Sequence, residues 1–172
     1  MKIYTDVLPQ ELIDECGNQI QTMATQRVWG PSVFNWVDDI KSSSCGEVLA
    51  VYIPADLVIK LNDALHETYF SSYKQTKKLI YQFYVWNKLS SIDMHLDTKY
   101  TIGASIYLNK TWNTNLGGLF VWEDKKTDHA LKVLCPKQNM MVINDIDEKH
   151  GVTLVSPYIS MPRLSIQIFG TA

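Results

Sequence analysis

Long apolar runs, an excess of basic charge and a cysteine framework are all missing from this sequence. No stretch approaches the roughly 18 consecutive apolar residues of a membrane-spanning helix. Residues 1–6 contain one lysine and lack the apolar core of a signal peptide. We therefore expect a soluble, cytoplasmic protein with no membrane partner.

The charge balance and the cysteine content exclude further classes of protein. Sixteen Lys plus Arg stand against 18 Asp plus Glu, so no global basic field would attract nucleic acid, which makes it an unlikely partner. Cys16, Cys45 and Cys135 are odd in number and form no CxxC pair, which argues against a disulfide framework or a zinc knuckle. We expect three buried free thiols.

The periodicity of the apolar residues changes after residue 78. Apolar residues recur at helical spacing over 8–23 and again over 54–69, separated by a loop over 29–45 and a strand-like run over 47–53. Short β-branched or aromatic runs then predict strands over 79–86, 101–108, 118–122, 131–134, 140–143, 151–155 and 164–169. Helices followed by strands indicate an α+β fold. We expect a single domain, 1–172, with helical support from 1–78 packed on one face of a barrel or sandwich formed by 79–172.

A short His-x-Asp motif is the first candidate site. In an extended segment His95 and Asp97 point to the same side, so one metal ion could bind both side chains. The motif alone is weak, because composition predicts about 0.4 such pairs in a chain like this. His150 strengthens it, since this residue stands at the entrance to a predicted strand and could supply a third ligand. Two histidines and one carboxylate on one face of a metal leave three positions open, as in non-haem Fe(II) oxygenases.

Arginine is scarce, and its placement is informative. The chain has only Arg27 and Arg163, and Arg163 opens the last predicted strand. Its planar guanidinium can grip a carboxylate through two hydrogen bonds. By strand alternation Ser165 and Gln167 share its face, while apolar residues occupy the other face. We expect the polar face to line a cavity; the alternative is a half-exposed strand.

Taken together and in order, these motifs resemble the prolyl 4-hydroxylase-like branch of the 2-oxoglutarate/Fe(II)-dependent dioxygenases. The resemblance spans roughly 79–170 and is carried by short elements at 95–97 (HLD), 107–112 (YLNKTW), 117–120 (GGLF), 136–144, 150–152 (HGV) and 163–165 (RLS). It implies a double-stranded β-helix, a jelly-roll or cupin-like core, with His95, Asp97 and His150 binding iron.

The resemblance also implies a co-substrate site. Arg163 and Tyr107 would bind the distal carboxylate of 2-oxoglutarate, with Ser165 and Gln167 as secondary contacts, and no other protein group would act as a catalyst. Fe(II), 2-oxoglutarate and O₂ would be required, with ascorbate as a reductant. One departure is visible: Arg163 follows His150 by 13 positions, whereas about nine or ten are usual in that branch.

The substrate is less constrained than the metal site. Tyr84, Trp86, Asn87 and Trp122, together with the loop 29–36, are candidates for a substrate cleft. The leading expectation is hydroxylation of a peptidyl proline in a peptide or protein, and the alternative is hydroxylation of a free amino acid or another small metabolite. A cupin-like metal-binding protein without oxygenase activity, or a partner-binding scaffold with a degenerate site, remains open, and oligomeric state is not indicated.

Overall fold

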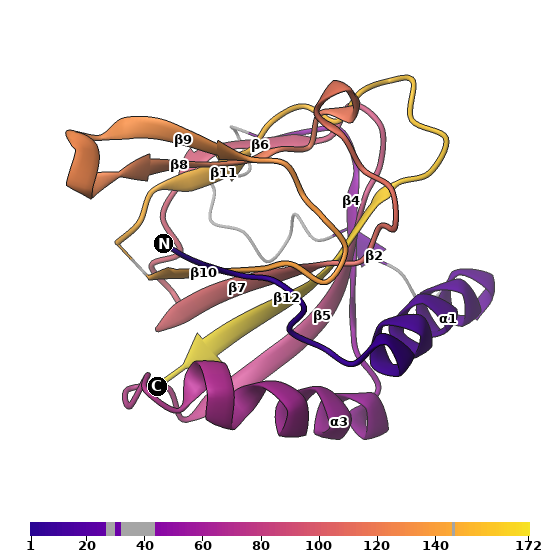
Figure 1. The fold of residues 1–172 in the computed structure, drawn as a ribbon. Helices are drawn as coiled ribbons and strands as arrows, with labels where there is room; N and C mark the ends of the chain where they lie inside the picture. Colours follow the sequence, from indigo (N-terminus) through magenta and orange to yellow (C-terminus); the bar gives the residue numbers. More distant parts are fainter. Residues whose placement is uncertain (27–29, 32–43, 146) are drawn as a thin grey trace.

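Two antiparallel β-sheets face each other in the computed structural model, and two helices cover the outer side of the larger sheet (Figure 1). The structure describes residues 1–26, 30–31, 44–145 and 147–172. The seven-stranded sheet has the order β1-β10-β7-β12-β5-β4-β2, and the five-stranded sheet has the order β3-β6-β11-β8-β9. The elements are β1 (Lys2–Tyr4), α1 (Gln10–Gln26), β2 (Gly30–Pro31), β3 (Ser44–Cys45), β4 (Val48–Tyr52), α3 (Ala55–Leu65), the π-helical turn η2 (His66–Phe70), β5 (Lys78–Trp86), β6 (Ser91–His95), β7 (Ile102–Tyr107), η3 (Thr114–Leu116), β8 (Phe120–Asp124), η4 (Lys125–Thr127), β9 (Ala130–Leu134), β10 (Met141–Asp145), β11 (His150–Val152) and β12 (Arg163–Thr171).

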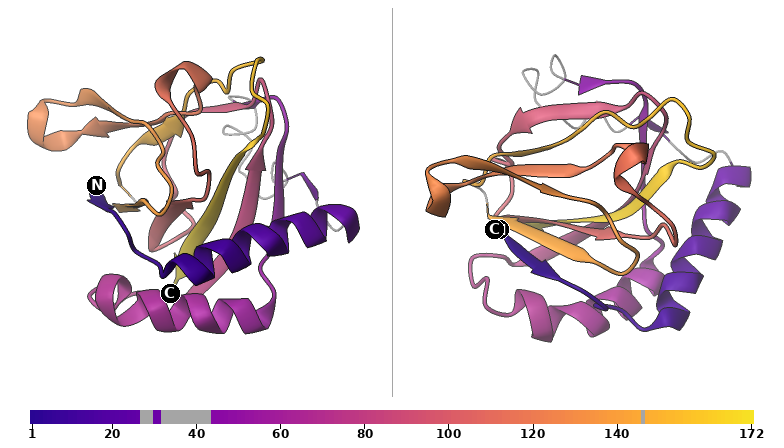
Figure 2. Two further views of the ribbon diagram at one scale, coloured as in Figure 1. Left: turned by 45° about the vertical axis from the view of Figure 1, so that its right-hand side comes forward. Right: turned by 45° about the horizontal axis from the view of Figure 1, so that its top comes forward.

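The main apolar core lies between the helices and the outer face of the seven-stranded sheet. Leu57, Leu61 and Leu65 recur every four residues along α3 and are buried, which is the stripe that an amphipathic helix presents to a sheet. They join a cluster that includes Ile166 and Ile168 of β12. The turned views in Figure 2 show α1 beside α3, outside the space between the two sheets.

The expected α+β class and jelly-roll core are confirmed, and most predicted strands are present. The segment 1–78 contributes more than helices, because β1, β2, β3 and β4 pair into the two sheets. The strand β1 has three residues and β2 and β3 have two each, too short for a periodic pattern to reveal them. The expected loop over 29–45 lies largely outside the described residues.

Two further sequence expectations can be compared with the structure. Cys16 is buried as expected, but Cys45 is exposed and Cys135 is half-buried, so burial of all three thiols is wrong. Cys45 lies on the two-residue strand β3, where its Sγ is 2.9 Å from Ser91 Oγ. Within the residues that the structure describes, no helix has the length and apolar character needed to cross a membrane.

Strand register brings the polar half of β12 to the inner face of the large sheet. Arg163 pairs with Trp86 of β5, and Ser165 pairs with both Tyr84 of β5 and Tyr107 of β7. Directly paired residues of antiparallel strands point to the same side, so these side chains all face the small sheet. The apolar residues between them point to the helices, and the candidate site therefore lies between the two sheets.

Candidate functional site

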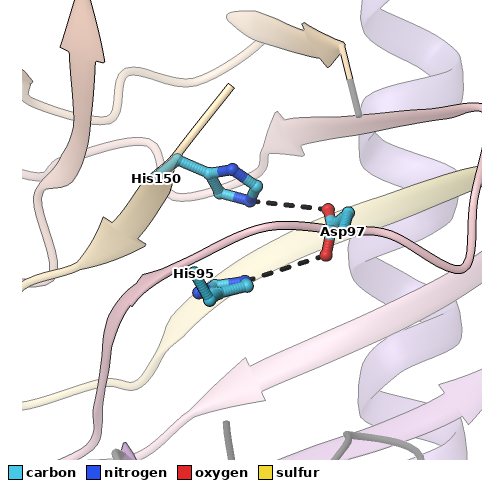
Figure 3. A group of neighbouring side chains, drawn as sticks. All are labelled: His95, Asp97 and His150. Atoms are coloured by element: carbon cyan, nitrogen blue, oxygen red, sulfur yellow. Dashed lines mark ion pairs between the residues drawn. The ribbon is translucent and has the colours of Figure 1, made fainter. Parts of the chain in front are cut away.

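The three predicted metal ligands converge between the sheets (Figure 3). His95 is the last residue of β6, Asp97 lies two residues beyond it, and His150 is the first residue of β11. Because His150 pairs directly with His95, both imidazoles point to the same side. One nitrogen from each histidine and one Asp97 oxygen lie within 4.8 Å of one another.

Backbone carbonyls orient both imidazole rings. Nδ1 of His95 is 2.8 Å from the carbonyl oxygen of Asp93, and Nδ1 of His150 is 2.8 Å from that of Glu148. A carbonyl oxygen can only accept, so each Nδ1 donates to its carbonyl, and Nε2 is the nitrogen that each ring turns toward Asp97. Phe120 stacks on the His150 ring, with 5.5 Å between the ring centroids.

Asp97 completes a set of three ligand atoms. Its Oδ1 lies 3.7 Å from His95 Nε2 and its Oδ2 lies 3.4 Å from His150 Nε2. Burial tends to raise the pKa of Asp97, but His150, His95 and Asn144 together hold it below its ordinary value. One carboxylate and two imidazole nitrogens form a donor set that fits a divalent transition metal.

Arg163 is the second charged feature of the site. Its side chain is only 1% exposed and lies over two rings, with its Cζ 5.0 Å from the Tyr107 ring centroid and 5.3 Å from that of Trp86. Burial lowers the pKa of Arg163, and Tyr107 opposes this shift. Burial also raises the pKa of Tyr107 to about 12, so its phenol stays protonated. The Tyr107 hydroxyl and the Nε and Nη1 of Arg163 form no hydrogen bond with the described residues, which fits a cradle for a ligand carboxylate.

The motif elements between the ligands position Arg163. Asn109 donates to the carbonyl oxygen of Pro162 at 2.9 Å and accepts from the backbone N–H of Leu164 at 2.7 Å, so it anchors the chain on both sides of Arg163. Gly118 has φ +59°, and a Cβ there would lie 2.9 Å from Arg163 Cδ. The longer connection between His150 and Arg163 is taken up at the surface, where Tyr158 is 91% exposed.

A pocket joins the metal-ligand cluster to Arg163, and it contains some of the other predicted residues. Tyr84, Trp86 and Gln167 line it together with the three candidate ligands and Arg163. Ser165 is fully buried, and its Oγ accepts from Gln167 Nε2 at 3.2 Å. Tyr107 also lies behind the pocket wall, against Arg163.

Other predicted residues lie away from the pocket. Asn87 does not line it and instead donates to Glu47 Oε2 at 2.6 Å. Trp122 pairs with His150 on the same face but packs toward Phe120, at 6.1 Å between ring centroids, and is not part of the pocket wall. The aromatic loop proposed over 29–36 lies outside the described residues, except for Gly30 and Pro31 in β2.

The two remaining histidines contact glutamates outside the metal-ligand cluster. His66 lies beside Glu67, and His129 is 64% exposed beside Glu123. In the described part of the chain, only His95, Asp97 and His150 form a group of three possible metal ligands.

Several pocket residues were not anticipated from the sequence. Ser105 and Gly103 of β7 share the inner face with Tyr107, and strand alternation could have indicated them. Phe169 could have been found in the same way from Arg163 and Gln167 on β12. The signal for Asn144 is weaker, a polar residue directly after an apolar run. The four line the pocket, and Ser105 donates to Gln167 Oε1 at 2.8 Å.

Comparison with known proteins identifies the fold. No protein-family model and no curated protein sequence matches this chain. Among solved structures, a prolyl-4-hydroxylase from Pseudomonas putida superposes with a TM-score of 0.74 at 15% identity, covering 99% of this chain and 91% of that chain. A prolyl hydroxylase from Trichoplax adhaerens, in complex with a hypoxia inducible factor peptide fragment, gives 0.77 at 13% identity, with coverages of 99% and 82%. The chain has the fold of the 2-oxoglutarate-Fe(II) oxygenases.

The same oxygenase fold occurs with a different reaction. The non-haem α-ketoglutarate-dependent epimerase SnoN from nogalamycin biosynthesis superposes with a TM-score of 0.72 at 10% identity, covering 99% of this chain and 77% of that chain. The choice of substrate and reaction must therefore come from side chains rather than from the oxygenase fold itself.

Proposed function

We propose that this protein is a 2-oxoglutarate- and Fe(II)-dependent dioxygenase that hydroxylates an unactivated C–H bond, with a peptidyl proline as the leading substrate. One observation carries the proposal: a His-Asp-His cluster shares a single pocket with a buried guanidinium whose Nε and Nη1 have no hydrogen-bond partner among the described residues. His95, Asp97 and His150 would hold Fe(II), while Arg163 and Tyr107 would bind the distal carboxylate of 2-oxoglutarate. Iron with 2-oxoglutarate and O₂ supplies the oxidising chemistry, and the co-substrate leaves as succinate and CO₂.

The chain's own residues have positioning tasks in this proposal. The carbonyls of Asp93 and Glu148 fix both imidazole rings, which would leave each Nε2 free to bind the metal. Arg163 neutralises and orients the dicarboxylate, so that its other end meets the metal ligands. Tyr84, Trp86 and Phe169 give the pocket an aromatic wall, with Tyr84 and Phe169 ring centroids 6.5 Å apart, on which a prolyl ring could pack.

Anaerobic titration of the metal-free protein with Fe(II) and 2-oxoglutarate tests the central claim. We expect the weak visible charge-transfer band of a chelated Fe(II)–2-oxoglutarate complex, and its absence at saturating reagents would refute the assignment. His150→Ala should abolish the band, whereas His129→Ala, which changes an exposed histidine outside the cluster, should retain it.

Succinate release then separates the candidate substrates. Proline-containing peptides should stimulate release above the substrate-free rate, with a mass gain of one oxygen in the peptide. Stimulation by free amino acids or metabolites alone would favour the small-molecule alternative. The epimerase with the same fold makes product analysis necessary, because an epimerised product has no mass gain.

A further inference from the structure

Asn144 is a buried amide beside the metal-ligand cluster. It is 4% exposed, lies near the end of β10 and lines the pocket. Its Nδ2 is 3.4 Å from Oδ2 of Asp97. The amide nitrogen faces the carboxylate because two acceptor oxygens would repel each other, so Asn144 donates this hydrogen bond.

Gly103 makes this contact possible. It pairs directly with Asn144 across β7 and β10. A Cβ on Gly103 would lie 2.9 Å from Asp97 Oδ2 and 2.9 Å from Asn144 Nδ2. The amide and the carboxylate therefore meet over a residue that has no side chain, and a methyl group on Gly103 would force one of them to move.

The hydrogen bond distinguishes the two oxygens of Asp97. Oδ2 accepts the hydrogen bond from Asn144 Nδ2. Oδ1 instead lies 3.7 Å from His95 Nε2, and this amide does not contact it. A carboxylate can bind a metal through one oxygen or through both. Two histidines and a carboxylate bound through one oxygen leave three positions on an octahedral metal, but a carboxylate bound through both leaves two.

We propose that Asn144, seated over Gly103, holds Oδ2 of Asp97 and thereby makes this carboxylate bind the metal through Oδ1 alone. This inference rests on the proposed function, because a dioxygenase of this kind needs two positions for the chelating co-substrate and a third for O₂. Asn144 is then a positioning residue, acting through Asp97.

Water-proton relaxation of the Mn(II) form tests this without turnover, because its enhancement grows with the number of waters on the metal. In Asn144→Ala the enhancement per bound Mn(II) should fall by about one third, as two open positions replace three. The affinity for Mn(II) should fall about 10- to 100-fold, as for the loss of other groups that orient metal ligands. Gly103→Ala keeps the amide but separates it from Asp97, so it should give the same loss of one water.

Asn62→Ala is the matched control. Asn62 lies on α3 and accepts a bond of the same length, 3.4 Å, from the Tyr81 hydroxyl, so this variant should keep the wild-type relaxation and affinity. Wild-type relaxation in folded Asn144→Ala and Gly103→Ala proteins that bind Mn(II) would overturn the role of Asn144 and leave the proposed function standing. Failure of the wild-type protein to bind Mn(II) or Fe(II) would instead remove the proposed function and this inference with it.

Discussion

Replacing Arg163 by methionine should stabilise the ligand-free protein and abolish its response to 2-oxoglutarate. Arg163 is 1% exposed, and Nε and Nη1 of its guanidinium have no hydrogen-bond partner among the described residues. Methionine keeps an unbranched apolar chain against Trp86 and Tyr107 but removes the charge. The substitution therefore separates the cost of burying the charge from its use in binding.

The expected magnitude follows from two opposing effects. An ionised group buried without a partner costs several kcal/mol. The contacts of Arg163 with the Trp86 and Tyr107 rings return roughly 0.5–2 kcal/mol each. The difference predicts that Arg163→Met raises the free energy of unfolding by about 1–3 kcal/mol without ligand. In wild-type protein, 2-oxoglutarate at 100 times its Kd should add about 2.7 kcal/mol, and this addition should vanish in the variant.

Urea unfolding of the Mn(II) form, with and without 2-oxoglutarate, measures both quantities. Succinate, which has a distal carboxylate but no keto group, serves as a second probe of the Arg163 cradle. The reasoning fails if Arg163→Met is less stable than wild type by 2 kcal/mol or more without ligand and still gains the full stabilisation from 2-oxoglutarate. That result would mean that Arg163 is a structural residue.

Three further substitutions test the packing around the site and the buried thiol. Gly118→Ala should lower the free energy of unfolding by roughly 1–2 kcal/mol, because an alanine is strained at φ +59°. The new methyl group should also displace Arg163 and weaken 2-oxoglutarate binding, whereas the affinity for Mn(II) should stay unchanged. Gly17 lies on α1, where an added Cβ would meet no atom within 4 Å, so Gly17→Ala should instead raise the free energy of unfolding by about 0.5–1 kcal/mol. Equal effects of Gly118→Ala and Gly17→Ala in urea unfolding would contradict this account. Burial raises the pKa of the Cys16 thiol from 9.0 to about 12, so its contribution to stability is complete below pH 9 and is lost as the pH rises toward 12. Between pH 7 and pH 10 wild-type protein should lose about 1.4 kcal/mol more than Cys16→Ala, and parallel losses in urea unfolding would show that the thiol does not titrate this way.

The candidate ligands could be predicted from sequence because their signals are local. His95 and Asp97 share a face by spacing alone, and His150 and Arg163 each begin a strand that the apolar pattern reveals. The unusual 13-residue spacing from His150 does not by itself show where the Arg163 side chain lies. Its position depends on the hydrogen bonds of Asn109 with Pro162 and Leu164, which connect residues more than 50 positions apart.

Asn144 and Gly103 show why the rest of the site could not be predicted in the same way. Each is unremarkable in sequence, and their meeting depends on the register between β10 and β7. A one-residue slip in that register would turn Asn144 away from the pocket and place an apolar neighbour beside Asp97. The bond that selects one oxygen of Asp97 thus arises from long-range pairing, and local patterns can identify metal ligands without revealing how many positions the protein leaves open on the metal.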